Sequence, residues 1–433
     1  MSELSAKLAA ALPSNSGVQP QWLKNLRETG AEQFRTIGLP TRKSEAWKYT
    51  GLGTIDQADV RMVSGFTTPF SEESHPLPLV ETGLQLKLLD GKLLAQTGDG
   101  PTGLTVMPLA DALGSGVKGL RAMLESLAET QTKGASGHGF SALNSATLES
   151  GLLIHVASGI DAGQLSLLWS TSQDETPLLF NSRICVMLEK GAKLELLEQF
   201  ESTGDNANTS NIILQAELGD GSRLQHIRFQ QEAEKAVLIT RTEVSQLADS
   251  EYAYFGFDLG GGLVRHDLHA SLLGSGAKSS INGAYLLDGS RHVDNHTRVD
   301  HIAPGGFSDQ YFRGVAGGSG RAVFNTAVCV HPGADETEAR QSNANILLSA
   351  RAEIDTKPEL EIYADEVVAS HGATVGQLDE LAVFYLRSRG LSEQEARQMM
   401  TTAYCQSVSD KQTDPDLGGV ISQRMMDVMP QAE

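Results

Sequence analysis

Alternating apolar and polar positions between Arg351 and Ala364 predict a β-strand with one buried face. The small or apolar members of this alternation are Ala352, Ile354, Thr356, Leu360, Ile362 and Ala364, and most residues between them are charged. A period of two residues places one side of a strand against a core and the other side in solvent. Pro358 cannot donate a ladder hydrogen bond, so we expect the strand to be interrupted there.

The apolar spacing becomes helical beyond this strand. One apolar run ends at Gly390, and its members are Leu381, Phe384, Tyr385 and Leu386. Ser392 and Glu395 have the spacing of a capping box, so a second helix is expected to begin there and to carry Met399 and Met400. The apolar surface is larger than a helical hairpin needs, so it either fits a partner groove or packs against the strands.

Residues 141–368 contain short strand patterns that recur along the chain. Similar turns begin at Gly191, Gly221 and Gly276, at spacings of roughly 30 residues or a multiple of that. A repeated unit that cannot bury its own apolar face must stack on its neighbours. Short strands without helices between them exclude a doubly wound sheet. A β-sandwich and a β-solenoid both remain possible folds, and the recurrence favours a β-helix, which is a solenoid.

Residues 1–140 carry mixed helix and strand patterns. Asp90 and Gly91 between two leucine-rich runs predict a β-hairpin with a tight turn. One or two helices are expected between residues 104 and 127. The Gly-, Ser- and Thr-rich stretch 131–139 predicts a domain boundary.

The segment Thr41–Thr50 combines basic residues with Trp47 and Tyr49. Such a group in an acidic chain is either a docking patch or an anchor, in which the aromatic rings are buried while the lysines stay solvated. We favour the anchor, in which the aromatic residues hold an N-terminal arm in place.

Composition and charge narrow the function classes. Glycine is abundant, with 44 residues, and aromatic residues are only 6% of the chain, which favours tight turns and slim strands. The formal charge of −20 argues against a nucleic-acid or anionic-membrane surface, because phosphate groups are bound by clustered Lys and Arg. The length of 433 residues allows two or three domains.

Cysteine usage and the chain start predict a cytoplasmic protein. Cys185, Cys329 and Cys405 lie far apart and form no CxxC motif, so neither a disulfide framework nor a cysteine metal clip is expected. Cys185 and Cys329 stand in apolar, strand-like contexts and are expected to be buried. Residues 1–11 lack the long apolar core of a secretory signal, and no run approaches the ~18 apolar residues of a membrane span.

The richest polar cluster runs from Arg291 to His301. On a strand, one face would carry His292, Asp294, His296, Arg298 and Asp300. Two imidazoles and two carboxylates on one face could ligate a metal. Arg298 in their midst opposes cation binding, and alternating charges can instead pair across a strand face, which is the interpretation we favour.

No nucleotide-binding motif is complete. Gly274–Ser279 lacks the spacing of a Walker loop, and Gly317–Gly320 lacks the βαβ setting of a dinucleotide site. We therefore expect no ATP hydrolysis by this chain.

Several long stretches carry a resemblance to a known family. They are EIDTKPELEIYADEV, SHGATVGQLDE and FYLRSRG toward the C-terminus, with GLPTRK and WKYT near the N-terminus. These stretches resemble the SufB/SufD family of iron–sulfur cluster assembly scaffolds, in particular its SufD branch. In addition to the two N-terminal stretches, the resemblance covers most of the chain after about residue 140.

The resemblance implies a mainly β protein with three parts. A central right-handed parallel β-helix, residues 141–368, would lie between an N-terminal helical and mixed domain, 1–140, and a C-terminal helical domain, 369–433. The protein would be a non-catalytic scaffold subunit of the SUF complex. Its β-helix would pair with a SufB-like paralogue, and whether it forms a homodimer without that paralogue is left open.

The family's second partner is a SufC-like ABC-type ATPase, which hydrolyses the ATP. The resemblance places its binding surface on the C-terminal helices. The apolar residues that would form it are Leu381, Phe384, Tyr385, Leu386, Met399 and Met400.

His371 is the residue that the resemblance implicates at the paralogue interface. The segment Ser370–Gly376 predicts a Gly-bounded loop at the domain junction, where a side chain is exposed for function. Imidazole is a ligand for iron as well as zinc. The alternative is a histidine that only packs in the interface.

One histidine cannot hold an iron–sulfur cluster, which takes mostly thiolates. A transient cluster at the interface would therefore draw most ligands from the partner, and no cofactor is expected on the isolated chain. Many SufD-like sequences carry a cysteine two positions before this histidine, where the present chain has Ala369, so this segment supplies no thiolate.

Two other functions remain as alternatives. A β-helix carbohydrate-active enzyme would use paired carboxylates, such as Asp294 and Asp300, but the low aromatic content and lack of a secretory signal argue against it. A stand-alone metal-binding protein would carry stoichiometric iron when isolated, and we expect little.

Overall fold

The computed structural model describes most of the chain. The described residues are 2–13, 19–57, 60–63, 78–81, 83–133, 139–172, 176–202, 207–412 and 414–430. Part of the expected boundary at 131–139, residues 134–138, lies outside them. None of the described helices is both long and apolar enough to span a membrane.

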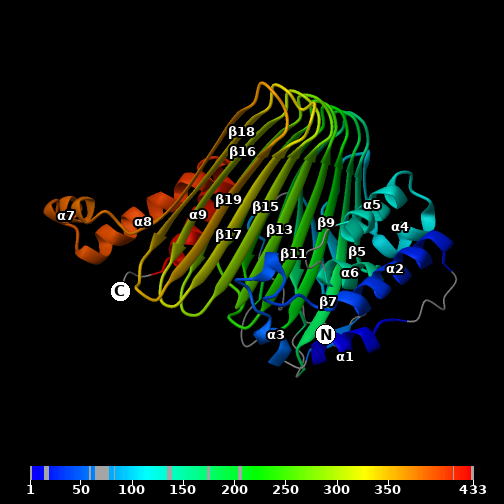
Figure 1. The fold of residues 1–433 in the computed structure, drawn as a ribbon, viewed down its shortest axis with the longest axis horizontal. Helices are drawn as coiled ribbons and strands as arrows, with labels where there is room; N and C mark the ends of the chain where they lie inside the picture. The colour runs from blue at the N-terminus through cyan, green and yellow to red at the C-terminus, as the bar shows by residue number, and fades with distance from the viewer. Residues whose placement is uncertain are drawn as a thin grey trace.

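Two mainly parallel sheets wind the chain into a β-solenoid (Figure 1). The repeating strands of the first, which we call sheet A, are β5 (Gly151–Val156), β7 (Leu178–Leu188), β9 (Thr209–Leu218), β11 (Val237–Gln246), β13 (Leu263–Leu272), β15 (His292–His301), β17 (Arg321–Val330) and β19 (Glu353–Ile362). Those of sheet B are β6 (Asp161–Ser170), β8 (Lys193–Glu201), β10 (Arg223–Gln231), β12 (Glu251–Asp258), β14 (Lys278–Leu287), β16 (Phe307–Ala316), β18 (Glu338–Leu347) and β20 (Val368–Gly376).

Consecutive strands alternate between the two sheets, so two strands make one turn of the solenoid. Each strand pairs in parallel with the strand one turn away; Leu263 pairs with His292, which pairs with Arg321. Side chains that meet across neighbouring strands are 28, 29 or 30 residues apart in three buried pairs. The recurrence in the sequence is therefore one turn, and the prediction of a parallel β-helix is confirmed.

Alternate residues of each strand fill the space between the sheets. The interior positions of β15 and β17 include Val293, Val299, Phe324 and Val328, each at most 2% exposed. This arrangement follows from the period of two, because successive side chains of a strand point to opposite faces.

Helices cover parts of the outer faces. The outer face of sheet B is apolar at Phe229 and Phe257, and the C-terminal helices pack on it through Cys405 and Ile421. Helices of the N-terminal region pack on part of sheet A (Figure 1). All three cysteines are buried, as expected for Cys185 and Cys329.

The N-terminal region contributes strands to both sheets. Its elements are α1 (Glu3–Ala10), α2 (Gln21–Ile37), the 3-10 turn η1 (Glu45–Trp47), α3 (Gly53–Gln57), β1 (Arg61–Val63), β2 (Leu84–Leu89), β3 (Lys92–Thr97), β4 (Leu104–Pro108), α4 (Leu109–Ser115), α5 (Leu120–Lys133) and α6 (Gly139–Ala146). β2 pairs with β6, and β4 pairs antiparallel with β5. The two sheets therefore continue into this region, and the segment expected to be helical from residue 104 begins with a strand.

The hairpin predicted around Asp90 and Gly91 joins β2 to β3. Both turn residues have positive φ, 48° and 82°. This conformation suits a two-residue hairpin turn and is tolerated by Asp and Gly.

Trp47 anchors the N-terminal arm to sheet A, as the sequence predicted. Its ring is 4% exposed, lies 5.8 Å from the Phe140 ring, and has the Arg265 guanidinium 4.7 Å from its centroid. Lys48 remains exposed. The aromatic ring is therefore buried while the cation stays in water.

Pro358 does not interrupt its strand, contrary to our expectation. β19 runs from Glu353 to Ile362, and Pro358 pairs with Thr326 of β17. β19 is the last strand of sheet A, and an edge strand tolerates the missing N–H because one side has no ladder to break.

The C-terminal region contains three helices, α7 (Glu380–Ser388), α8 (Glu393–Ser409) and α9 (Pro415–Asp427), of which α7 and α8 lie close to the predicted positions. Both hydrogen bonds of the capping box between Ser392 and Glu395 are present at the start of α8. α8 and α9 lie along sheet B, whereas α7 projects beyond the strand stack (Figure 1).

Two phenylalanines should differ strongly in their effect on stability. Phe324, 1% exposed and 4.4 Å from the Phe312 ring, is in the solenoid core, whereas Phe384 on α7 is 68% exposed. We expect Phe324→Ala to lower the free energy of unfolding by about 3–5 kcal/mol, and Phe384→Ala by less than about 0.5 kcal/mol. Denaturant unfolding of both variants measures this, and equal losses would contradict the assignment of the core.

Candidate functional site

His371 lies on a strand, not in the loop that the sequence predicted. It is exposed in the middle of β20, where it pairs with Gln341 of β18. The register with β18 continues through Gly372, so the strand extends past the expected junction and the helices begin only at α7. An exposed histidine at the end of the solenoid is nevertheless what the sequence led us to expect.

The side chain of His371 faces the interior side of β20. Ala369, two residues earlier on the same side, packs against the core between the sheets. No turn follows β20 in the described chain, so the imidazole lies over the open end of the solenoid. Ala369 fills the position next to it with a methyl group, and no thiol is nearby on this strand.

A chain of hydrogen bonds lies beneath His371. Gln341, 4% exposed, donates to the Thr326 hydroxyl at 3.0 Å. Thr326 and Thr297 both donate to Gln310, at 2.9 and 2.6 Å. These bonds hold the amide of Gln341 in one orientation directly below the terminal strand.

The two sheets end in exposed edges. β19 and β20 are the last strands, and neither has a strand on its outer side within the described residues. Free backbone N–H and C=O groups along such edges can pair with strands of another chain. His371 lies on one of these two edges.

A second exposed surface lies on α7 and the adjoining part of α8. Four of the six apolar residues predicted to bind a partner are strongly exposed, namely Leu381 at 79%, Phe384 at 68%, Tyr385 at 56% and Met399 at 49%. We call these four residues the α7–α8 patch. The other two, Leu386 and Met400, are half-buried and pack against the cluster under α8 and α9. Large exposed apolar groups clustered in this way are typical of an interaction surface.

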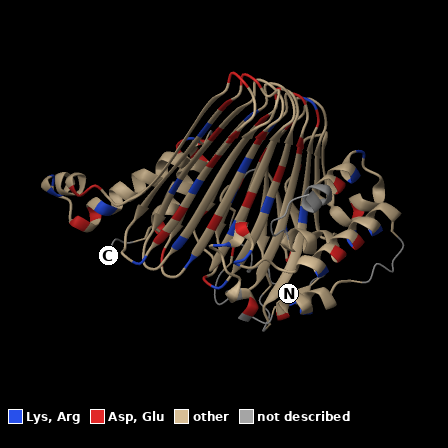
Figure 2. Cartoon of the chain, in the orientation of Figure 1, with Lys and Arg blue, Asp and Glu red and all other residues tan. Residues whose placement is uncertain are grey.

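Opposite charges alternate across the outer face of sheet A (Figure 2). β15 presents the predicted face, with Asp294 bound by Arg265 of β13 and Asp300 bound by Arg298. His269 of β13 lies between the carboxylates of Glu243 and Asp300. The predicted charge ladder is therefore present, and it extends over neighbouring strands.

Asp294 joins this ladder to the N-terminal arm. Its carboxylate accepts hydrogen bonds from Thr50 and Arg265, and His296 Nε2 lies 2.9 Å from the other oxygen. Burial alone would raise the pKa of Asp294, but Arg265 and His296 outweigh it and hold the pKa well below its usual range. Arg265 also donates to the Ala46 carbonyl at 2.8 Å, so one ion pair fixes strand and arm together.

His292 is held differently from the other histidines of β15. Its Nε2 lies 2.9 Å from the Thr50 hydroxyl, and burial lowers its pKa to about 4. His301 faces the interior and bonds Ser308 at 2.8 Å. The histidines of the Arg291–His301 cluster therefore point to separate partners and do not converge on one ion.

Asp294 and Asp300 do not form the carboxylate pair of a glycoside hydrolase. They lie six positions apart on one strand, which places them roughly 20 Å apart, whereas such enzymes need a separation of about 5 to 10 Å. Burial would raise the pKa of each carboxyl group, but neighbouring cations outweigh it and lower the pKa. Neither group is therefore a general acid. The geometry removes the basis of the carbohydrate-enzyme alternative.

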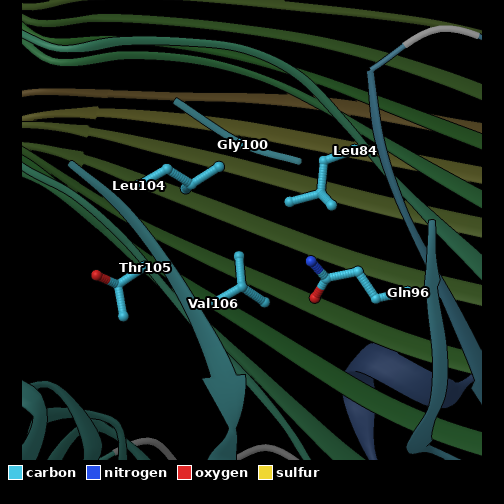
Figure 3. Close-up of a pocket in the computed structure, with 6 residues that line it drawn as sticks. All are labelled: Leu84, Gln96, Gly100, Leu104, Thr105 and Val106. Carbon is cyan, nitrogen blue, oxygen red and sulfur yellow. The ribbon is translucent and has the colours of Figure 1, made fainter. Parts of the chain in front are cut away.

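A cavity of about 290 Å³ lies at the opposite end of the solenoid (Figure 3). It is lined by Leu84, Gln96, Gly100, Leu104, Thr105 and Val106. The side chains of Leu84, Leu104 and Val106 surround it, and Gln96 contributes an amide (Figure 3). Among the described residues that line it, none is acidic, basic or a thiol.

Comparison with known proteins identifies the family. A family model described as SUF system FeS cluster assembly, SufBD core domain, matches residues 169–404, more than half of the chain. The chain belongs to the SufBD family. The region matched by the SufBD model begins in β6, ends in α8, and includes both His371 and α7.

Curated SufBD relatives match almost the whole chain. The iron–sulfur cluster assembly protein SufD of Escherichia coli is 28% identical over 97% of this chain and 99% of its own. An iron–sulfur cluster assembly SufBD family protein of Synechocystis is 28% identical over 92% and 89% of the two chains. The chloroplastic protein ABCI7 of Arabidopsis thaliana is 27% identical over 94% and 84%. The chain is therefore a SufD-type member of the SufBD family.

One side-chain cluster of this SufBD protein was not found from the sequence. Asp300, Cys329 and His331 bring an oxygen, a sulfur and a nitrogen atom within 4.8 Å of one another. The spacing Cys329-x-His331 on one strand was a usable signal, since i and i+2 share a face. The carboxylate, however, comes from the preceding turn, and only the register of β15 with β17 reveals it.

Replacing Asp294 should destabilise the protein in a pH-dependent way. Asp294→Asn removes one of the two carboxylates that bind the buried Arg265, which keeps Asp267 as a partner, so we expect a loss of about 1–3 kcal/mol in unfolding free energy at pH 7. A carboxyl group whose pKa is lower in the folded than in the unfolded state stabilises the folded protein at pH values above its unfolded pKa, about 4. This stabilisation is lost as the pH falls from there toward the folded pKa. The wild-type and variant stabilities should therefore converge below pH ~4.

Denaturant unfolding at several pH values measures this difference. Asp161→Asn is the matched control, because Asp161 pairs with Lys193 at an exposed position and should change stability by less than about 1 kcal/mol. A difference between wild type and Asp294→Asn that stays constant from pH 7 to pH 3 would contradict the proposed ion pair.

Proposed function

We propose that this protein is a non-catalytic scaffold subunit of a cytoplasmic SUF iron–sulfur cluster assembly complex. It pairs with a SufB-like paralogue through the open end of its solenoid, and binds a SufC-like ABC-type ATPase through the α7–α8 patch. The observation that carries the proposal is the pair of free strand edges at β19 and β20 in a chain of the SufBD family.

Edge pairing suits an interface between two related solenoids. A paralogue with the same solenoid would present strands of matching spacing, so its end could continue both sheets of this chain. Because His371 faces the interior side of β20, its imidazole would lie inside the joined solenoids, near the junction. That position suits a ligand for a cluster that is built and then passed on.

The chemistry at the junction requires the partner. His371 supplies one nitrogen, and Ala369 supplies no thiolate, so the remaining cluster ligands come from the paralogue. The cluster is the product of the assembly and leaves it. Because the paralogue supplies most of the cluster ligands, it carries most of the chemistry, and the present chain supports the assembly.

The α7–α8 patch has the composition of a protein-binding surface. Its members are aromatic and aliphatic, and α7 and α8 also carry charged residues. Among these, Arg397 pairs with Glu380 at 2.9 Å and Arg387 pairs with Glu393 at 3.3 Å. Nucleotide-driven closure of two ATPase subunits would move α7 and thereby shift the paired solenoid ends, which opens the junction for assembly.

Co-expression with the neighbouring ATPase and paralogue genes tests the proposal. Native mass spectrometry of the purified material is expected to give a complex that contains all three chains. Isolation of this chain only as a monomer or homodimer, with both other proteins expressed and soluble, would contradict the scaffold function.

Substitution in the α7–α8 patch should release the ATPase. We expect Leu381→Ala with Phe384→Ala to weaken ATPase binding by more than tenfold, since exposed aromatic anchors dominate such interfaces, at about 2 kcal/mol or more each. Leu247→Ala is the matched control, because Leu247 is 46% exposed but lies in the turn between β11 and β12. Calorimetric titration measures both affinities, and equal binding by the two variants would contradict the assignment.

Replacing His371 should lower the cluster content of the complex. His371→Ala removes an exposed ligand and no core contact, so the melting temperature should not change, while the iron and sulfide bound per complex should fall several-fold. His155→Ala, a histidine substitution near the other end of the solenoid, is the control. Unchanged iron and sulfide content under anaerobic reconstitution would exclude a ligand role for His371.

A further inference from the structure

Cys329 and His331 point to the outer face of sheet A near its C-terminal end. Cys329 is on β17 and His331 directly follows that strand. Val328 and Val330, the alternate residues, are buried in the core at 1% and 0% exposure. A thiol and an imidazole therefore stand side by side on the outer face of the sheet, with Cys329 itself buried at 3% exposure and His331 partly exposed.

The two flanking strands add carboxylates. Cys329 is in register with Asp300 of β15 on one side and Glu361 of β19 on the other. His331 Nε2 lies 3.0 Å from an Asp300 oxygen, and the ligand atoms of Asp300, Cys329 and His331 all lie within 4.8 Å of one another. Glu361 is exposed, so its carboxylate can turn toward the neighbouring thiol.

We propose that Cys329, His331 and Asp300, with Glu361 as a fourth ligand, bind a divalent transition-metal ion such as Zn²⁺ or Fe²⁺. One thiolate, one imidazole and two carboxylates form a donor set of intermediate softness, which suits these ions and not Mg²⁺ or Ca²⁺. Tetrahedral ligands about 2.0–2.3 Å from a metal lie roughly 3.5 Å apart, so side-chain movements of about 1 Å bring the ligand atoms of Asp300, Cys329 and His331 to that spacing.

His269 determines which oxygen of Asp300 can bind a metal. His269 lies between two carboxylates, with Nδ1 3.0 Å from a Glu243 oxygen and Nε2 2.5 Å from Asp300 Oδ2. Both of its ring nitrogens are therefore engaged, so His269 holds one Asp300 oxygen in place and is not a ligand. The other oxygen faces His331 and is the one available to a metal.

Arg298 is the competitor for the metal. Its guanidinium donates to both Asp300 oxygens, at 2.9 and 2.8 Å. The Arg298 side chain is 43% exposed, so it can rotate into solvent when an ion occupies the site. Removing this guanidinium should therefore strengthen metal binding.

The site differs in position and in function from His371. It lies on the outer face of sheet A, whereas His371 is on β20 of sheet B at the end of the solenoid. It needs no residue from a second chain, so its test does not depend on the scaffold proposal.

Cobalt titration of the purified, metal-free full chain tests this site. Co²⁺ under anaerobic, reducing conditions should produce a thiolate-to-cobalt charge-transfer band in the near ultraviolet and intense visible bands of a four-coordinate ion, saturating at one ion per chain. Zn²⁺ should abolish both sets of bands. Wild-type protein that gives no charge-transfer band at stoichiometric cobalt would overturn the proposal.

Matched variants assign the band to this cluster. Cys329→Ser should abolish the charge-transfer band, whereas Cys405→Ser, at a fully buried thiol on α8, should retain it. His331→Ala should weaken binding by more than about tenfold, and Arg298→Ala should tighten it. Retention of the band in Cys329→Ser, or equal affinity in His331→Ala and wild type, would overturn the assignment.

Folding controls keep the test decisive. Circular dichroism and thermal melting should show that each variant is folded like the wild type. If Cys329→Ser does not fold, His331→Ala and Arg298→Ala decide, since both side chains are at least 41% exposed and opposite changes in cobalt affinity are expected from them.

Discussion

Parallel pairing between one turn and the next is the interaction on which the rest of the structure depends. Because each strand of the repeating turns pairs with strands one turn away, the neighbours of a residue on a sheet face come from about 30 positions earlier and later in the chain. This pairing brings Arg265 to Asp294 and Asp300 to Cys329. It also leaves His371 exposed on the last strand, while Gln341, one turn earlier, is buried.

The same stacking permits polar groups in the interior. Arg228 donates to Asp258 at 2.6 Å, and the other Asp258 oxygen accepts from Asn295 at 2.9 Å, although all three side chains are buried. A buried charge is strongly unfavourable without partners. Strands stacked at a fixed spacing supply these partners across turns, so the interior carries hydrogen-bond chains among its apolar residues.

The sequence predicts those features that depend on local pattern. Alternation with a recurrence of one turn predicts the β-helix, and the spacing of Ser392 and Glu395 predicts the start of α8. The position of His371 on a strand was not predictable from its Gly-flanked neighbourhood, since pairing with β18 overrides local preference. The cluster of Asp300 with Cys329 required the register, because turns differ in length and the partner of a residue cannot be counted from the sequence alone.

The hairpin at Asp90 and Gly91 gives the solenoid two unlike ends. β3 and β4 run antiparallel to their neighbours, so the N-terminal end terminates the parallel stack, whereas β19 and β20 leave it open. Head-to-tail growth into a filament requires two complementary ends. Because β3 and β4 run opposite to β20 and β19, the parallel pairing cannot continue head to tail from one molecule into the next, so the fold favours a closed pair over a fibre.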